Sequence, residues 1–261
     1  MADLRIIDLT PETIADYGVC GYKDVKKHAE LRNKIAWFRE YYPKGLRIKA
    51  LMAEDGTYQG MLEYLPGEYA HRPVASAGYM FIHCIFLGFK KEYKGRGLGS
   101  LLIRQCIEDA RGQRMRGVAA VTREGSFMAG PGIFLKNGFH VVDTAKPDFS
   151  LTALVFDEIA PVPRFMSGLA ERAAAYGDTL AVLRSVQCPY TEKNVKAILD
   201  SATGNFGLKA ELVDLSDHRA AQGSPCPFGT FCIIHNGEVI SHHPISATRF
   251  ENIMKKRLGW E

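Results

Sequence analysis

The sequence predicts a mixed α/β protein built from two domains. Short apolar segments typical of strands alternate with amphipathic segments typical of helices along the chain. At 261 residues, of which 46% are hydrophobic, the chain can supply two separate cores. The stretch Ala160-Pro161-Val162-Pro163 marks a change in composition. We therefore expect a first domain over residues 1–158, a linker over 159–170 and a smaller second domain over 171–261.

The first domain shows a regular order of elements. Strands are expected at Leu4–Leu9, Leu46–Ala53, Tyr58–Tyr64, Tyr79–Leu87 and Gly117–Thr122, with a terminal hairpin running to about Phe156. Apolar residues spaced three and four apart predict a helix over Asp24–Tyr42, ended by Gly45, and another from Leu98. The pair Asp55-Gly56 indicates a hairpin turn between two of these strands. Mixed strands and helices in this order indicate a mixed sheet covered by helices.

Composition and charge exclude several classes of protein. No apolar run approaches the ~20 residues that cross a bilayer, and the N-terminus lacks the apolar region of a signal peptide. The net charge of +4 is small, and no basic stripe with interleaved aromatic residues indicates a nucleic-acid partner. The six cysteines are irregularly spaced, which favours reduced thiols, and no metal site is expected. We expect a cytoplasmic protein with neither a membrane nor a nucleic-acid partner.

A glycine-rich segment, Lys94-Gly95-Arg96-Gly97-Leu98-Gly99-Ser100, joins the strand Tyr79–Leu87 to the following helix. Glycines let the backbone turn sharply and expose its N–H groups, so the loop and the helix N-terminus form a site for an anion. The spacing fits neither a P-loop nor a dinucleotide-binding fingerprint. Nearby lysines and arginines favour a polyphosphate ligand.

The segment resembles the acyl-CoA loop of the GNAT acetyltransferase family, which reads Arg or Gln, two residues, Gly, one residue, then Gly or Ala. Lys94 is the one departure within the motif. The segment Ile133–Phe139, which ends in Gly-Phe, is similar to a second element of that family. The resemblance implies the acyl-CoA N-acyltransferase fold and acetyl-CoA (coenzyme A) as the cofactor, bound by Ile85, Phe86, Leu87, Lys94, Gly95, Arg96, Gly97, Leu98, Gly99, Ser100, Phe134 and Lys136.

The activity that the resemblance implies is transfer of an acetyl group from acetyl-CoA to a primary amine, by direct attack in a ternary complex. A base must take the proton of the amine, and His83 and Glu63 are the candidate catalytic residues. The alternatives are a core histidine bonded to the backbone for His83 and a solvated strand face for Glu63. Cys84 invites an acetyl-cysteine mechanism, but alternation along a strand predicts that it points away from His83.

A proton donor for the leaving thiolate is less clearly indicated. Many relatives have a tyrosine where this sequence has Phe134. Tyr79, Tyr93 and Ser126 are alternative donors, and departure of the thiolate without assistance is the remaining option.

The acceptor amine is expected to bind between the loop Gly67–Pro73 and the segment from Ser126. Glu68, Tyr69, Arg72 and Ser126 are the candidate acceptor-binding residues, because an acid, an aromatic ring and a cation together suit a polar amine. The acceptor is expected to be a small-molecule or peptide amine. Its identity stays open, as does the oligomeric state, for which a homodimer is one candidate.

The second domain is expected to be thioredoxin-like. Its predicted order is the strand Leu180–Val186, the helix Glu192–Ala202, strands Leu208–Leu215, Thr230–His235 and Glu238–His242, and a helix from Ala247. Cys188-Pro189-Tyr190-Thr191 resembles the glutaredoxin motif Cys-Pro-Tyr-Cys, with Thr191 in place of the resolving cysteine.

Cys188 is predicted to be reactive, because this order places it at a helix N-terminus, where the helix dipole favours a thiolate. Cys188 and Cys226 are candidate redox residues that could form a disulfide or hold a soft metal. Vestigial cysteines in a binding domain are the alternative. An acetyltransferase with this type of tail is similar to those that carry a YoaP-type domain. A thiol-redox or soft-metal-responsive protein, whose first domain senses acyl-CoA, is the alternative function.

Overall fold

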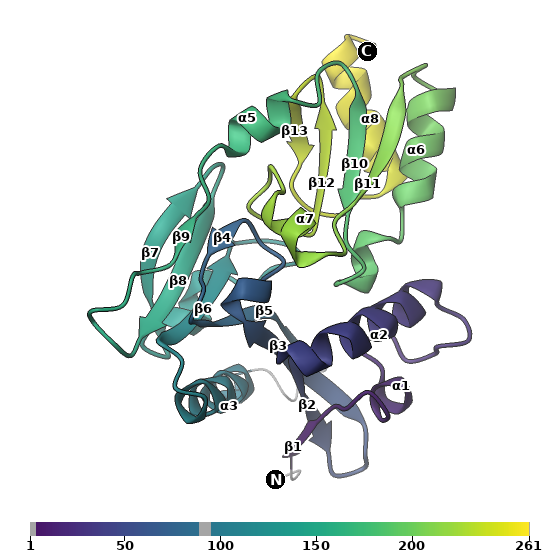
Figure 1. Cartoon of the computed structure of the whole chain (residues 1–261). Coiled ribbons are helices and arrows are strands. Elements are labelled where there is room, and N and C mark those ends of the chain that lie inside the picture. The colour runs from purple at the N-terminus through teal and green to yellow at the C-terminus, as the bar shows by residue number, and fades with distance from the viewer. Residues whose placement is uncertain (1–3, 89–94, 261) are drawn as a thin grey trace. The chain divides into compact units, whose positions relative to one another are not determined.

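The computed structural model describes residues 4–88 and 95–260, and the chain divides into two compact units (Figure 1). The first unit comprises the chain up to Ala70 together with Val74–Phe165, and the second comprises His71–Pro73 and the chain from Met166. The mixed α/β class expected from the sequence is confirmed. None of the helices in the described ranges is long and apolar enough to cross a lipid bilayer.

The first unit is built on a seven-stranded sheet of order β1-β2-β3-β5-β6-β8-β7, in which β5 and β6 are parallel and the other neighbours are antiparallel. Its elements are β1 (Leu4–Asp8), α1 (Ile14–Tyr17), α2 (Ala29–Tyr41), η1 (Tyr42–Lys44), β2 (Arg47–Ala53), β3 (Tyr58–Pro66), η2 (Gly67–Tyr69), β4 (Val74–Ala75), β5 (Met80–Leu87), α3 (Leu98–Gly112), β6 (Gly117–Thr122), α4 (Pro131–Leu135), β7 (His140–Ala145), β8 (Phe149–Val155) and β9 (Arg164–Phe165).

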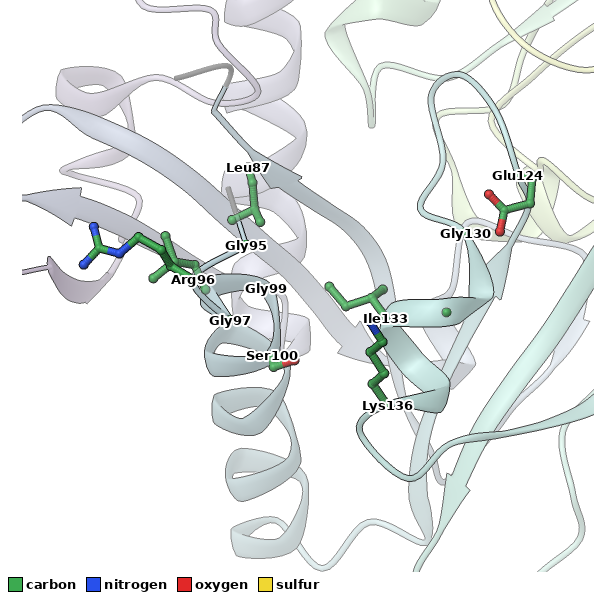
Figure 2. A pocket seen from close by; sticks show the side chains of 12 residues that line it. Leu87, Gly95, Arg96, Gly97, Gly99, Ser100, Glu124, Gly130, Ile133 and Lys136 are labelled. Carbon is green, nitrogen blue, oxygen red and sulfur yellow. The ribbon is translucent and has the colours of Figure 1, made fainter. Parts of the chain in front are cut away.

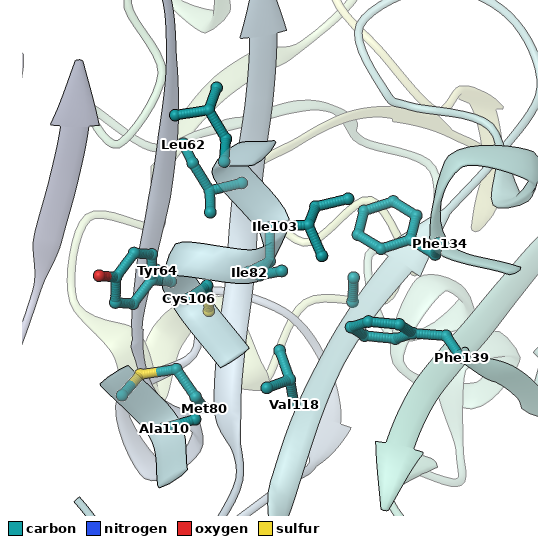
Figure 3. Packing of buried hydrophobic residues seen from close by; sticks show 12 residues of the cluster. Leu62, Tyr64, Met80, Ile82, Ile103, Cys106, Ala110, Val118, Phe134 and Phe139 are labelled. Atoms are coloured by element: carbon teal, nitrogen blue, oxygen red, sulfur yellow. The ribbon is translucent and has the colours of Figure 1, made fainter. Parts of the chain in front are cut away.

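Helix α3 covers one face of this sheet. The core between them contains Leu62, Tyr64, Met80, Ile82, Leu102, Ile103, Cys106, Ala110, Val118, Ala120, Phe134 and Phe139 (Figure 3). Burial of each large aliphatic side chain contributes roughly 1.5–3 kcal/mol, so this core fixes α3 against β3, β5 and β6. Successive residues of a strand face opposite sides, and Glu63 therefore lies on the other face, where it contacts Lys34 of α2.

Helix α2 begins later than the sequence indicates. The helix predicted from Asp24 starts at Ala29, because the Asp24 carboxylate accepts hydrogen bonds from the backbone N–H groups of Lys26 and Lys27 and forms a turn there. The strands of this unit lie within about two residues of their predicted bounds. The short elements α1, η2, β4 and β9 were not anticipated.

The second unit has a four-stranded sheet of order β11-β10-β12-β13. Its elements are α5 (Leu169–Ala174), β10 (Leu180–Arg184), η4 (Pro189–Thr191), α6 (Val195–Gly204), β11 (Ala210–Asp214), α7 (His218–Gln222), β12 (Phe231–His235), β13 (Glu238–Ser241) and α8 (Ala247–Leu258). Strand β10 is parallel to β11 and antiparallel to β12. The predicted order of long elements is present, and the thioredoxin-like interpretation stays a prediction.

Candidate active site

The N-terminus of α3 carries unbonded backbone donors. Gly97 is its N-cap residue and has φ +72°, a left-handed conformation that favours glycine. The first bond of the helix runs from the Leu101 N–H to the Gly97 carbonyl, at 3.0 Å. The three preceding N–H groups, of Leu98, Gly99 and Ser100, therefore have no carbonyl of the helix to bond and are donors for an anion.

A cavity of about 540 Å³ opens in front of these donors (Figure 2). It is lined by Leu87, Gly95, Arg96, Gly97, Leu98, Gly99, Ser100, Glu124, Gly130, Gly132, Ile133 and Lys136. A Cβ atom added at Gly95 or Gly97 would meet no atom within 4 Å, so the backbone borders open space at both positions. The cavity combines backbone donors, two cationic side chains and an apolar wall, which suits a ligand with an anionic and an apolar part.

Most of the residues expected to bind the cofactor line this cavity, namely Leu87, Gly95, Arg96, Gly97, Leu98, Gly99, Ser100 and Lys136. Lys94 lies outside the described residues, as does Tyr93. Ile85 packs beside the core under α3, and Phe86 is partly buried, and neither is among the lining residues. Phe134 is buried in the core, with its ring 5.5 Å from that of Phe139.

The opposite wall of the cavity was not anticipated. It comes from the segment after β6 and from α4, where Pro131 stands in the first turn, and it contributes Glu124, Gly130, Gly132 and Ile133. The Asn137 side chain donates to the Ser100 hydroxyl at 2.9 Å and to the Ile133 carbonyl at 2.7 Å, which ties this wall to α3. The Pro-Gly sequence that begins α4 is the signal that could have indicated a shaped turn there.

Strand β5 changes its pairing part-way along its length. It pairs with β6 over Met80–Ile82 and, in the described part of the chain, not beyond. On its other side the register with β3 shifts between Glu63 and Tyr64, because Glu63 is opposite Cys84 and Tyr64 is opposite Ile82. His83 is therefore the extra residue of a β-bulge. Beyond the bulge, the described residues of β5 pair with β3 and not with β6.

The two candidate catalytic residues meet at this bulge. His83 Nδ1 lies 3.2 Å from Glu63 Oε1, and the ammonium of Lys34 bonds to Glu63 Oε2. The side chains of Glu63 and His83 are 0% exposed, and that of Lys34 is 1% exposed. Burial alone would raise the pKa of the Glu63 carboxyl, but the Lys34 charge and the hydrogen bond with His83 lower it to about 2. Glu63 is thus a buried carboxylate, and the solvated-face alternative is wrong.

The bulge also corrects the predicted orientation of Cys84. Residues directly opposite in an antiparallel pair have side chains on the same face, so Cys84 shares the face of Glu63. His83 bonds Glu63 and lies on that face as well. The sequence argument that strand alternation separates Cys84 from His83 was wrong, because alternation does not hold across a bulge.

The candidate acceptor-binding residues lie in separate environments. Glu68 and Tyr69 form the turn η2, and Ser126 is exposed in the segment after β6. Arg72 is 5% exposed and belongs to the second compact unit, where its guanidinium lies 5.6 Å from the Phe228 ring. Tyr79 precedes β5 at the end opposite to Leu87 and is buried, which removes it as a proton donor for this cavity.

The environment of Cys188 differs from the expected one. The α-helix predicted to begin at Glu192 begins at Val195, and Pro189–Thr191 form a 3₁₀ turn. Cys188 is the N-cap residue of this 3₁₀ turn and does not adjoin the start of the α-helix, so the N-terminus beside it is that of one short turn. Cys188 is partly buried and Cys226 fully buried, and both are thiols in this structure.

Two protein-family models match parts of this chain. Residues 12–130 match the model of the acetyltransferase (GNAT) family, and residues 210–252 match the YoaP-like model. The GNAT match covers a little less than half of the chain, and the YoaP-like match lies within the second compact unit. The GNAT match ends at Gly130 and so includes the bulge of β5, the described part of the glycine-rich loop and α3.

One curated relative aligns with this chain along nearly its whole length. The chain is 25% identical over 251 residues to the uncharacterized N-acetyltransferase YoaP of Bacillus subtilis, an alignment that covers 95% of this chain and 97% of the relative.

Solved structures similar to the GNAT domain come from several bacteria. One is a GNAT family N-acetyltransferase from Escherichia coli in complex with CoA, with 10% identity and a TM-score of 0.40 over 63% of this chain and 91% of that chain. Another is a candidate streptothricin acetyltransferase from Bacillus anthracis in complex with acetyl coenzyme A, with 19% identity and a TM-score of 0.35 over 45% of this chain and 68% of that chain.

Proposed function

We propose that this chain is an acyl-CoA-dependent N-acetyltransferase that moves the acetyl group of acetyl-CoA to a primary amine. The observation that carries the proposal is the cavity at the N-terminus of α3, which combines unbonded N–H groups, cationic side chains and glycines that border open space. The match to the GNAT family supports it.

The pyrophosphate of acetyl-CoA binds the N–H groups of Leu98, Gly99 and Ser100, because the end of a helix with free donors favours an anion. Arg96 and Lys136 line the same cavity and add positive charge. Lys94, which lies outside the described residues, is proposed from the sequence alone to bind the same anion.

The pantetheine arm runs along the part of β5 that no longer pairs with β6. The backbone of Ile85, Phe86 and Leu87 follows the bulge, and its N–H and C=O groups bond the amides of the arm. The thioester then lies near the bulge, because the arm extends from the pyrophosphate site toward the middle of the sheet.

The chemical step is direct attack of the amine on the thioester carbonyl. A C–N bond forms as the C–S bond breaks, CoA leaves as its thiolate, and the proton of the amine passes to His83 Nε2 through a water molecule, because the His83 side chain is fully buried. Glu63 accepts the hydrogen bond of His83 Nδ1 and does not itself take the proton of the amine. Phe134 supplies no proton to the thiolate, and Tyr93, Ser126 and unassisted departure stay the predicted alternatives.

The acceptor is a small-molecule or peptide amine. Glu68, Tyr69 and Ser126, all in the first compact unit, are proposed to contact it, since they combine an acid, an aromatic ring and a hydroxyl. Arg72 belongs to the second compact unit, and its contact with the acceptor stays a prediction from the sequence. No observation in the described ranges favours the redox or metal-responsive alternative, because Cys188 does not stand at the start of α6.

Calorimetric titration of acetyl-CoA into the full chain tests the proposal, with Gly97→Val as the variant. A β-branched residue at φ +72° is strained by about 1–3 kcal/mol and projects into the open space of the cavity, so affinity is expected to fall at least tenfold.

Gly112→Ala is the matched control. Gly112 ends the same helix, and a Cβ there also meets nothing within 4 Å, so binding is expected to stay at the wild-type level. Absence of binding in the wild type, or equal binding in wild type and Gly97→Val, contradicts the proposed site.

A further inference from the structure

Lys34 is a buried cation on the apolar face of α2. Its ammonium lies 4.2 Å from the centre of the Trp37 ring and bonds to the Glu63 carboxylate. Leu31 and Phe38, one turn away on either side, are 0% exposed. Lysine is seldom fully buried, and an apolar residue of similar volume often stabilises a protein as well as a buried ion pair does. Stability alone therefore does not account for Lys34.

Glu63 uses both carboxylate oxygens. Oε2 accepts from Lys34 and Oε1 faces His83 Nδ1 at 3.2 Å. Because the carboxyl has a pKa of about 2, it is ionised at neutral pH and can only accept hydrogen bonds. His83 Nδ1 must then carry the proton, and Nε2 of the neutral ring is the unprotonated, basic nitrogen.

The same contact lies at the bulge of β5. The register between β3 and β5 passes over His83, and the side chain of His83 bonds Glu63 of β3 at the same level. In the described residues, the pairing of β5 with β6 ends at Ile82. The Lys34–Glu63–His83 network therefore lies where β5 stops pairing with β6.

We propose that Lys34 is a positioning residue for acetyl transfer: it keeps Glu63 ionised, and Glu63 in turn fixes the tautomer of His83. The inference rests on the proposed function, in which His83 Nε2 takes the proton of the amine. Lys34 itself touches neither substrate.

Loss of Lys34 changes the chemistry of the network. Without the ammonium, the buried Glu63 carboxyl binds a proton more readily, and a protonated carboxyl can donate to His83. His83 then loses its fixed tautomer. We expect Lys34→Met to lower kcat at least tenfold at pH 7 and to leave the affinity for acetyl-CoA within twofold, because the cavity at α3 does not include Lys34.

Two measurements on the full chain test this. Long-range ¹⁵N–¹H spectra of histidine-labelled protein report the His83 tautomer, with the signal assigned from His83→Gln. Release of CoA thiol from acetyl-CoA is followed with spermidine, with a lysine-containing peptide and without added amine. The wild type is expected to show unprotonated Nε2 at pH 7, and Lys34→Met a mixture of tautomers together with the lower rate.

Lys49→Met is the matched control. Lys49 is also largely buried in this sheet and pairs with Asp8 at 2.8 Å and Asp109 at 3.1 Å, on β2 rather than at the bulge. It is expected to keep the wild-type His83 tautomer. If Lys34→Met fails to fold, Lys34→Met/Glu63→Gln removes the unpaired charge, and the same loss of tautomer and rate is expected.

The outcomes separate the two proposals. An unchanged His83 tautomer in Lys34→Met, or a changed tautomer with an unchanged rate, overturns the role of Lys34 and leaves the proposed function intact. A wild type that neither binds acetyl-CoA nor releases CoA overturns the proposed function itself, whatever the spectra show.

Discussion

The two parts of the proposed active site differ in how they are built. The N-terminus of α3 offers backbone N–H groups beside glycines whose missing side chains leave open space. The Lys34–Glu63–His83 network, in contrast, places three polar side chains in a fully buried position. Binding at the first part depends on backbone shape, whereas the second depends on the balance of charge among its members. The comparison teaches that one unit can combine an open site shaped by backbone geometry with a buried site set by paired charges.

The two parts should therefore respond differently to substitution. Changes at the α3 loop should alter ligand affinity more than folding, because the loop borders solvent-filled space. Changes in the network should alter folding strongly, because removal of one partner leaves the other charge buried without compensation.

The largest effect is expected for Glu63→Leu. The substitution leaves the Lys34 ammonium buried without its carboxylate, and loss of one partner of a buried pair costs about 3–5 kcal/mol. Urea unfolding of wild type and variant measures the difference in the free energy of unfolding. The double variant Lys34→Met/Glu63→Leu is expected to recover most of the loss, since both charges are gone. A double variant as unstable as Glu63→Leu would show that altered packing, and not the unpaired charge, causes the loss in the free energy of unfolding.

Acid should weaken the network before it affects the loop. The pKa of Glu63 is lowered from 4.5 to about 2 in the folded chain, so the folded state favours the ionised carboxyl. Its contribution to stability is fully present above about pH 4.5 and is lost as the pH falls from there toward 2. Urea unfolding at pH 6, 4 and 3 is expected to show a steeper decline for the wild type than for Glu63→Gln. Parallel declines would contradict the lowered pKa.

The smallest effect is expected for Lys136→Met at the cavity. Lys136 adds charge near a pyrophosphate that the backbone already binds, so we expect roughly a two- to fivefold loss of acetyl-CoA affinity that shrinks at high salt. Titration calorimetry at low and high ionic strength measures it. Lys196→Met, on an exposed lysine with an 88% accessible side chain in α6, is the control and should have no effect. A salt-independent loss would indicate packing rather than charge.

The sequence indicated the α3 loop well because its signal is local. The glycines, the preceding strand and the apolar face of α3 are contiguous in the chain, and Leu87, Gly95–Ser100 and Lys136 line the cavity. The wall that contains Glu124, Gly130 and Ile133 was missed, because it reaches the loop only through the packing of α4 against α3.

The sequence indicated Glu63 and His83 separately as candidate bases, but it did not predict that their side chains are in contact. Strand alternation placed Cys84 opposite to His83, and the bulge reversed that result. The position of Lys34 is unusual in the sequence itself, because a lysine stands between Leu31 and Phe38 on the apolar face of a helix. No neighbouring residue in the sequence identifies Glu63 as its partner. The start of α6 was misplaced by three residues, since Pro189 begins a 3₁₀ turn capped by Cys188 and α6 follows only from Val195.

The sequence by itself determined the mixed α/β class, the order of the long elements, and the glycine-rich loop at the start of α3. These depend on hydrophobic periodicity and on the conformations open to glycine, which are properties of neighbouring residues. Tertiary structure alone decided that β5 carries a bulge at His83 and that Lys34, Glu63 and His83 form one buried network. The physical reason is that a buried charge is stable only beside its partners, and those partners come from α2, β3 and β5, which only folding brings together.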